Sequence, residues 1–256
     1  HILIVVTLIN NHFFKIKVLD MKAFNREKLK TSIKESVCQL YKAQTQKHDL
    51  YRNTIDCFSA AIDCVVQGIT LDEWKREERQ RQIQKTKQNA IGTLHEMVMS
   101  SIDGVTHHKV GSGALIDIEC KGKMLIAEIK NKHNTTKGNH KVAIYDVLEQ
   151  SLESRPGYTG YYVEVLPPKR KIYDTPFTPS DHTTGNRRKA NEKIRQIDGK
   201  SFYALLTGHS NAIEELYETL PSIVSEIINE EFGQELDVDK VTSSAEFKEI
   251  FKKTYS

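Results

Sequence analysis

Cysteine is scarce in this sequence, with four residues among 256, and no two of them form a C-x-x-C pair. Closely spaced cysteine pairs are the usual ligands of structural zinc, so their absence argues against a zinc site. Cys57 and Cys64 lie two turns apart on one expected helix face, and we interpret them as reduced core residues. Together with the lack of a secretion signal, this favours a reducing, cytoplasmic compartment.

The sequence also lacks an apolar run of membrane-spanning length near its start. The stretch from His1 to Ile9 is mostly apolar, but a transmembrane helix needs about 20 such residues, and the basic start and small-residue exit of a secretory signal are missing. Met21 opens MKAFNREKLK, a natural helix entry. We therefore expect residues 1–20 to be a non-native or disordered extension, with a genuine edge strand as the alternative.

A strong charge imbalance is absent as well, because 37 Lys and Arg residues oppose 34 Asp and Glu residues. The distribution is uneven, however. Residues 169–200 contain nine basic and four acidic residues, whereas residues 211–239 contain nine acidic residues and no Lys or Arg. The first segment suits a phosphate backbone, although a solvated loop is the alternative. The second is expected to face away from DNA or to contact another subunit.

What is present is a change of periodicity along the chain. Thr70 and Glu73 form a capping-box signature at the start of a helix that is charged first and apolar after Ala90. After Gly104 the pattern becomes strand-like, and residues 168–200 show little periodicity, which is typical of functional or disordered segments. The expected helices cover 25–46, 48–66, 140–153, 201–206, 211–231 and 244–253, and the expected strands cover 107–110, 114–120, 124–130 and 157–166. This order predicts an α+β or α/β/α core with helical additions.

Three charges stand inside the apolar stretch ALIDIECKGKMLIAEIK. Because strand side chains alternate, Asp117 points away from its isoleucine neighbours, and Glu128 and Lys130 share one face. Such charges are costly unless they are paired or hold a metal. Two carboxylates suit Mg²⁺, and a nearby lysine can hold the attacking water or offset charge on a phosphate. A cross-strand Glu–Lys pair on a solvent-facing hairpin fits the same spacing.

Asp117, ten intervening residues and Glu128-Ile129-Lys130 resemble the PD-(D/E)xK nuclease signature, with Ile116 in place of the leading proline. The longer stretches QNAIGTLHE, IAEIKNKHNTTKG and NEKIRQIDGKSFYALLTG resemble type II restriction endonucleases, in particular the group that cuts GGNCC-type sites. The resemblance extends from about Lys87 to Tyr217.

The resemblance implies a restriction-endonuclease-like α/β/α core with a small mixed sheet. It also implies that Asp117 and Glu128 bind Mg²⁺, that Lys130 is the catalytic lysine, and that Glu96 is an accessory acidic residue. A satisfied surface group is the alternative for Glu96. Glu119 shares the expected face of Asp117 and is a reserve ligand, unless it pairs with a lysine of the Lys121-Gly122-Lys123 turn.

The expected substrate is double-stranded DNA, cut at a short specific site in a prokaryotic cell. A homodimer and a cognate DNA methyltransferase are the expected partners, and no membrane is involved. Other nucleases of this class, acting in repair or on branched DNA, and a non-catalytic DNA-binding relative are the alternatives. The candidate DNA-binding residues lie in two polar segments: Lys132, Asn134, Thr135 and Lys137 in the first, and Arg187, Arg188, Lys189, Asn191 and Arg195, which suit guanine and adenine edges, in the second.

We further expect four regions along the chain. These are the extension 1–20, an N-terminal helical region 21–86, the catalytic core 87–168, and a recognition segment with C-terminal helices, 169–256, that packs with the core as one domain.

Overall fold

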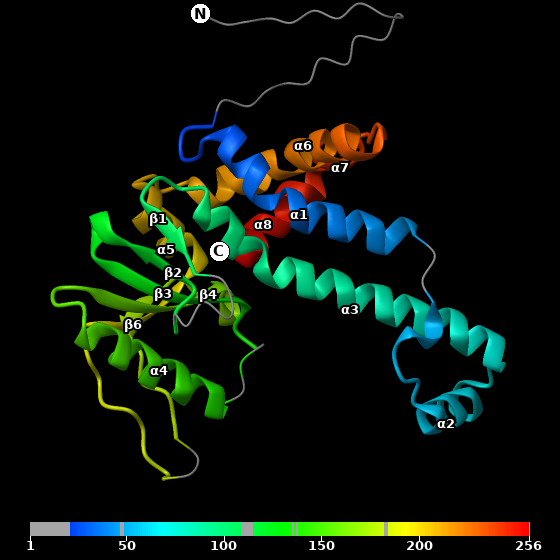
Figure 1. Cartoon of the computed structure of the whole chain (residues 1–256), viewed down its shortest axis with the longest axis horizontal. Coiled ribbons are helices and arrows are strands. Elements are labelled where there is room, and N and C mark those ends of the chain that lie inside the picture. Colours follow the sequence, from blue (N-terminus) through cyan, green and yellow to red (C-terminus); the bar gives the residue numbers. More distant parts are fainter. Residues whose placement is uncertain are drawn as a thin grey trace, which may run out of the picture.

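The computed structural model describes residues 21–46, 49–108, 115–134, 136, 138–181 and 184–255. Figure 1 shows its helices and strands. The helices are α1 (Arg26–Thr45), α2 (Cys57–Gln67), α3 (Leu71–Ser100), α4 (Gly138–Glu153), α5 (Gly199–Thr207), α6 (Ala212–Phe232), α7 (Asp239–Thr242) and α8 (Ala245–Thr254). The strands are β1 (Val105–His107), β2 (Ile118–Cys120), β3 (Leu125–Lys132), β4 (Thr159–Leu166), β5 (Asp174–Pro176) and β6 (Ile194–Asp198).

The six strands form one mixed sheet in the order β1-β2-β3-β4-β6-β5. β1, β2 and β3 run antiparallel in sequence, whereas β3, β4 and β6 are parallel. The parallel step from β3 to β4 requires a crossover, which α4 provides. The fold is therefore α+β, as the sequence predicts.

Helices cover both faces of the sheet and create two apolar cores. On one face, α4 contributes Ile144 and Leu148, which pack on Ile126 and Tyr162 of the central strands. The larger core lies on the other face, where α1, the end of α3, α5, α6 and α8 cover the sheet. This second layer fixes the end of α3 against the strands and so positions the polar side chains that α3 directs toward the edge of the sheet.

α3 is one continuous helix that changes surroundings along its length. The capping box is formed as predicted, with Thr70 and Glu73 bonding each other's backbone. The helix runs without a break through Gly92, and Val98 and Met99 are fully buried near its end. Its first half projects from the body with α2 (Figure 1); we call residues 49–90 the arm. The expected boundary between residues 86 and 87 therefore falls inside α3.

The helix expected over residues 48–66 is shorter than predicted. A single 3₁₀ turn, Leu50–Arg52, comes first, and α2 begins only at Cys57. Asp56 ends the preceding loop because its side chain accepts hydrogen bonds from the Phe58 and Ser59 backbone nitrogens, each at 3.0 Å. Gly68, at φ 67°, closes the helix in the left-handed region that favours glycine.

Residues 168–200 are more regular than predicted, because they contain β5 and β6. Ile194 and Ile197 are buried on opposite faces of the sheet, and β6 pairs with β4. β1 and β2 are shorter than expected, and residues 109–114 lie outside the described residues.

The acidic segment 211–239 contains α6, which contacts α1 of the same chain, and its expected position away from DNA or against another subunit stays a prediction. A row of basic residues on α1 covers α6. The ion pairs are Arg26 with Glu226 at 2.5 Å, Lys30 with Glu230 at 2.7 Å and Lys34 with Glu231 at 2.6 Å. The four-residue spacing of the three cations places them on one helix face, so α6 finds its counter-charges within the chain.

No helix in the described ranges combines the length and the apolar character that crossing a membrane requires.

Candidate active site

The sheet brings Asp117, Glu128 and Lys130 together. Asp117 lies just before β2, and its backbone nitrogen donates to the Ala127 carbonyl at 3.0 Å. Its carboxylate accepts a hydrogen bond from the Ile129 backbone nitrogen at 2.7 Å. Lys130 Nζ is 2.6 Å from Glu128 Oε1 and 4.0 Å from Asp117 Oδ2. The spacing in the sequence thus becomes a cluster of two carboxylates around one ammonium group.

α3 adds Glu96 to this cluster from across the edge of the sheet. Glu96 Oε2 is 3.3 Å from His107 Nε2 on β1, and both side chains are mostly buried. Burial, followed by the charge of Asp117, raises the pKa of Glu96 to about 7, while Lys130 opposes the shift. Glu96 therefore senses the charges of the central residues, although it bonds to none of them directly. His107 has no distinguishing signal in the sequence.

The electrostatics of the cluster favour a bound cation. Burial and the neighbouring charge of Asp117 raise the pKa of Glu128, because two carboxylates share a small space. Burial lowers the pKa of Lys130, but the negative charges of Glu128, Asp117 and Glu96 outweigh it and raise the pKa overall. Lys130 is thus protonated at neutral pH, and one ammonium group faces three carboxyl groups.

The donor set fits a magnesium-type site better than a site with a full cage of protein ligands. Among the described residues, no group of three or more His, Cys, Asp or Glu side chains is arranged to hold a metal ion. Magnesium usually takes one or two carboxylates and completes its shell with water and substrate phosphate. Asp117 and Glu128 supply that number, and their mutual repulsion is the feature that a divalent cation would relieve.

Comparisons with known proteins agree with this geometry. The profile of the Eco47II restriction endonuclease family matches residues 21–229. The chain belongs to this family. The type II restriction enzyme Eco47II of Escherichia coli is 35% identical over 188 residues, which cover 72% of this chain and 77% of that enzyme. The type II restriction enzyme Sau96I of Staphylococcus aureus is 31% identical over 174 residues, which cover 67% of this chain and 66% of that enzyme.

The protein is therefore a type II restriction endonuclease that cleaves DNA at a specific site, as the resemblance in its sequence implies. Enzymes of this class typically use a divalent metal, which is consistent with the two carboxylates of the cluster.

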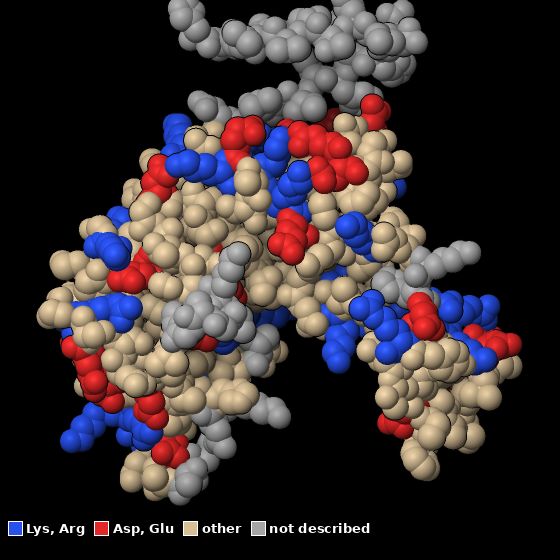
Figure 2. All heavy atoms as spheres, viewed as in Figure 1, with Lys and Arg blue, Asp and Glu red and all other residues tan. Residues whose placement is uncertain are grey.

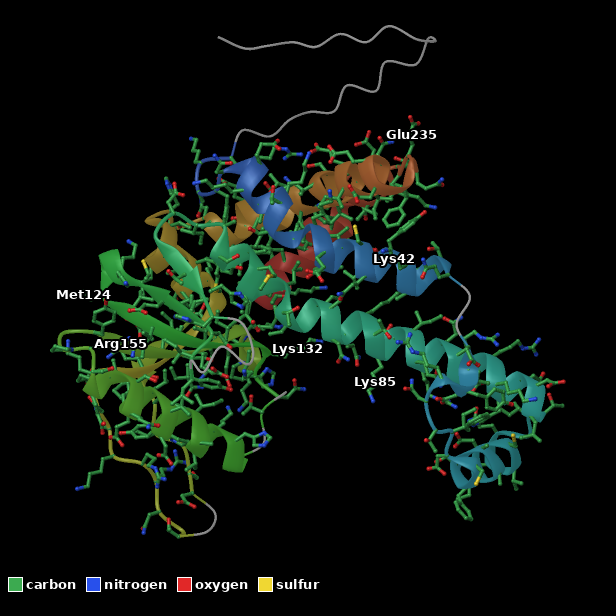
Figure 3. All side chains as sticks on the ribbon, viewed as in Figure 1. Lys42, Lys85, Met124, Lys132, Arg155 and Glu235 are labelled. Carbon is green, nitrogen blue, oxygen red and sulfur yellow. The ribbon has the colours of Figure 1, made fainter. Side chains whose placement is uncertain are left out.

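In this Eco47II-family enzyme, the first predicted DNA-binding segment follows directly from β3. Lys132 ends β3 and Asn134 lies in the following turn, and both are exposed. Figure 3 shows Lys132 at the side of the body that faces the arm. Thr135 and Lys137 lie outside the described residues.

The second predicted segment lies beside α4, and its cations have partners within the chain. Arg188 holds Asp146 through two nitrogens, at 2.8 and 2.9 Å, and also contacts Asp181 at 3.3 Å. Arg195 is 2.6 Å from both Asp174 and Glu192. The remaining three residues form backbone contacts: Arg187 donates to the Thr178 carbonyl, the Lys189 carbonyl accepts from Tyr145, and the Asn191 side chain accepts from the Lys193 nitrogen.

Glu119, the reserve ligand, has its charged partners outside the cluster. It is buried, with Arg155 at 3.4 Å and His108 at 3.7 Å. The expected pairing with Lys121 or Lys123 does not form either, since Arg155 reaches the carboxylate from the end of α4.

Sequence reasoning missed a second buried acid next to the cluster. Glu164 is the Cα partner of Lys130 in the parallel pair β3–β4, so the two side chains share a face of the sheet. Glu164 is fully buried and accepts hydrogen bonds from Lys141 at 2.7 Å, Tyr173 at 2.5 Å and Gln196 at 2.9 Å. An acid in the apolar strand GYYVEVL carries the same signal that identified Glu128.

Proposed function

We propose that Asp117 and Glu128 hold the Mg²⁺ ion of this restriction endonuclease and that Lys130 is its catalytic lysine. The observation that supports this is the approach of Lys130 Nζ to Glu128 at 2.6 Å and to Asp117 at 4.0 Å. Bound Mg²⁺ would polarise the scissile phosphate and lower the pKa of a bound water. Lys130 would orient the attacking water and offset the negative charge that develops on the phosphate oxygens.

Glu96 would act as an accessory acidic residue at the edge of this site. Its carboxyl group lies where the charges of Asp117 and Lys130 shift its pKa, so its ionisation and the charge of the central cluster depend on each other. His107, 3.3 Å away, would hold its orientation.

We also propose that the DNA duplex lies in the hollow between the body and the arm. Figure 2 shows this hollow on the molecular surface. Lys132 borders it from the body, and Lys85 projects toward it from α3 (Figure 3). Arg79 and Lys85 are exposed and form no ion pair with any carboxylate in the described part of the chain. Cations of this kind can exchange counterions for phosphates without breaking internal bonds.

Sequence reading would involve Arg187, Arg188, Lys189, Asn191 and Arg195, together with Lys132, Asn134, Thr135 and Lys137 on the phosphates. The recognition site would be GGNCC-like, following the resemblance in the sequence. Because Arg188 and Arg195 are bound to internal carboxylates, reading a base would require them to exchange those partners for guanine or adenine edges.

The functional unit would be a homodimer, because a symmetric site has two scissile bonds and each chain contributes one cluster of Asp117, Glu128 and Lys130. A cognate DNA methyltransferase would protect the host genome. A decayed, non-catalytic relative is disfavoured, since the two carboxylates and the lysine are all in place and in contact.

The decisive experiment compares wild-type protein with Lys130→Ala on unmethylated plasmid DNA, with Mg²⁺ and with EDTA. Wild-type protein should give discrete, Mg²⁺-dependent fragments, whereas Lys130→Ala should lose at least about 100-fold in rate, the scale for removing one group that stabilises transition-state charge. Its DNA affinity should stay within about two-fold, because the lysine acts on the transition state.

The matched control is Lys123→Ala, which removes an exposed lysine from the turn before β3 and should cleave normally. Normal cleavage by Lys130→Ala would refute the assignment. Smeared products instead of discrete fragments would favour a nuclease of the same fold without site specificity.

A further inference from the structure

α2 is oriented against the usual rule for a surface helix, because its apolar side faces the solvent. Phe58, Ile62, Val65 and Val66 are 78%, 62%, 84% and 78% exposed. Within this helix, all of which the structure describes, Ala60 alone is buried. A surface helix normally turns its large apolar side chains toward the core and its small or polar ones outward.

The exposed side chains form one continuous surface. Residues three and four apart lie on the same helix face, so Phe58, Ala61, Ile62, Val65 and Val66 make a single band, which we call the α2 stripe. The opposite face holds the helix to α3 through Asp63, whose carboxylate accepts a hydrogen bond from Trp74 Nε1 at 3.0 Å. That anchor fixes the stripe outward rather than leaving α2 free to turn over.

The chemistry of the stripe selects a protein as its partner. No Lys or Arg occurs between Asn53 and Thr70, and the charged neighbours are Asp56 and Asp63. A duplex would be repelled by these acids, and a helix that lies on a membrane surface usually has a basic polar face. Figure 2 shows the same contrast, since the tip of the arm is mostly uncharged surface whereas cations lie nearer the hollow.

The size of the stripe fits one half of a modest protein interface. The four large side chains expose roughly 600 Å² together, at the upper end of the apolar patches of ordinary monomers. A stable interface covers about 600–1,000 Å² on each partner. Two such stripes facing each other across a two-fold axis would therefore reach the lower end of that range, which corresponds to a weak dimer strengthened by shared DNA.

We infer that the α2 stripe binds the α2 stripe of a second copy of this chain. In this symmetric contact Ile62 and Val65, in the middle of the stripe, meet the same residues of the other subunit. The inference rests on the proposed homodimer and specifies its surface: the arms join the two subunits while each body keeps its own cluster of catalytic residues.

Sedimentation equilibrium of the full chain tests this surface without any cleavage measurement. Wild-type protein should be a dimer with a dissociation constant in the micromolar range. The double variant Ile62→Asp with Val65→Asp should raise that constant at least 10-fold, because it places like charges opposite each other at the axis. Ile172→Asp and Ile250→Asp change exposed isoleucines outside the arm and serve as matched controls. Circular dichroism and melting temperature establish that each variant is folded.

Three results would overturn the inference: a wild-type protein that stays monomeric with and without DNA, a stripe variant that dimerises normally, or controls that dissociate equally. A further measurement compares hydrogen exchange of α2 in the full chain with that in a chain starting at Met21. Protection of the stripe that depends on residues 1–20 would name that segment as the occupant instead and overturn the second copy. Loss of cleavage by a dimer that remains intact would count against the active site, not against this surface.

Discussion

Glu128 and Glu164 occupy neighbouring strands on the same face of the sheet, yet their charges are balanced in different ways. Glu164 receives three hydrogen bonds, from Lys141, Tyr173 and Gln196. Glu128 has Lys130 as its close cationic donor and shares its surroundings with the carboxylate of Asp117. The first arrangement stabilises a fixed negative charge, whereas the second leaves negative charge that a cation can neutralise.

The network around Glu164 predicts a pH-dependent stability. Burial alone would raise the pKa of Glu164, but the hydrogen bonds from Lys141, Tyr173 and Gln196 outweigh burial and lower it. The stabilisation is thus present above the ordinary carboxyl pKa and is lost as the pH falls through the lowered pKa of the folded state. Glu164→Gln should cost about 1.5–3 kcal/mol in the free energy of unfolding at pH 7, the usual range for hydrogen bonds to charged groups.

Urea denaturation of both proteins between pH 7 and pH 3 measures this effect. The difference in stability between the two proteins should shrink as the pH falls. Protonation of Glu164 removes its negative charge from the wild type, whereas the glutamine variant lacks that charge at every pH. Glu153→Gln, on an exposed carboxylate at the end of α4, is the matched control. If the difference in stability stays constant with pH, the charge of Glu164 does not contribute to the stability of the folded state.

At the scale of elements, the arm should carry part of the affinity for DNA. Replacing Arg79 and Lys85 with alanine removes two exposed cations that lack carboxylate partners in the described residues. We expect weaker binding of a specific duplex. The slope of the logarithm of the binding constant against the logarithm of the salt concentration should become shallower by about one for each phosphate that the variant no longer neutralises. Fluorescence anisotropy at salt concentrations from about 50 to about 200 mM measures both quantities.

Lys240→Ala, on α7 at the opposite side of the molecule (Figure 1), is the control for this removal of charge. An unchanged salt slope in the arm variant would place the duplex elsewhere. A lower cleavage rate with unchanged binding would assign the arm to positioning of the active site rather than to affinity.

The elements that sequence reasoning predicted correctly are those that local signals determine. The periodicity of α1 and the capping box of α3 are confirmed because neighbouring residues form both. The meeting of Asp117 with Glu128 and Lys130 follows from one short connection between β2 and β3. β5 and β6 were missed because strands of three and five residues in a polar segment are defined by their pairing with β4 and with each other.

The parts of the site that could not be predicted depend on contacts between distant segments. Glu96 comes near Asp117 and Lys130 only because α3 packs against β3, and Lys85 borders the hollow only because the arm projects from the body. The covering of α6 by α1 was recognisable in principle, since Arg26, Lys30 and Lys34 repeat every four residues. Their partner helix is 200 residues away along the chain, so the pattern alone named no acidic partner.

For the whole molecule, 37 basic and 34 acidic residues give a net charge of only +3, and many of these charges pair with each other inside the chain. Cations of α1 neutralise α6, Arg188 binds Asp146 of α4, and Arg195 binds Asp174 of β5. Among the described residues, the exposed cations without such partners include Arg79 and Lys85 of the arm. The general attraction for DNA should therefore come from the hollow, while specific reading would depend on exchanging the internal partners of the arginines.

Mixing subunits tests how many active sites serve one recognition site. Wild-type protein alone should convert a supercoiled plasmid with one site to the linear form with little nicked intermediate, because two clusters act on the two strands. Excess Lys130→Ala should form mixed dimers that contain one competent cluster, so nicked circles should accumulate. Gel electrophoresis over time gives the ratio of nicked to linear DNA.

That ratio separates mixed dimers from simple competition for the site. An inactive competitor would slow the disappearance of supercoiled DNA without changing the ratio of nicked to linear DNA. A mixed dimer would raise that ratio whatever the overall cleavage rate. Serum albumin at the same concentration controls for crowding. A ratio that stays constant as Lys130→Ala is added would mean that a single chain cuts both strands in turn, and the homodimer would no longer be needed for cleavage.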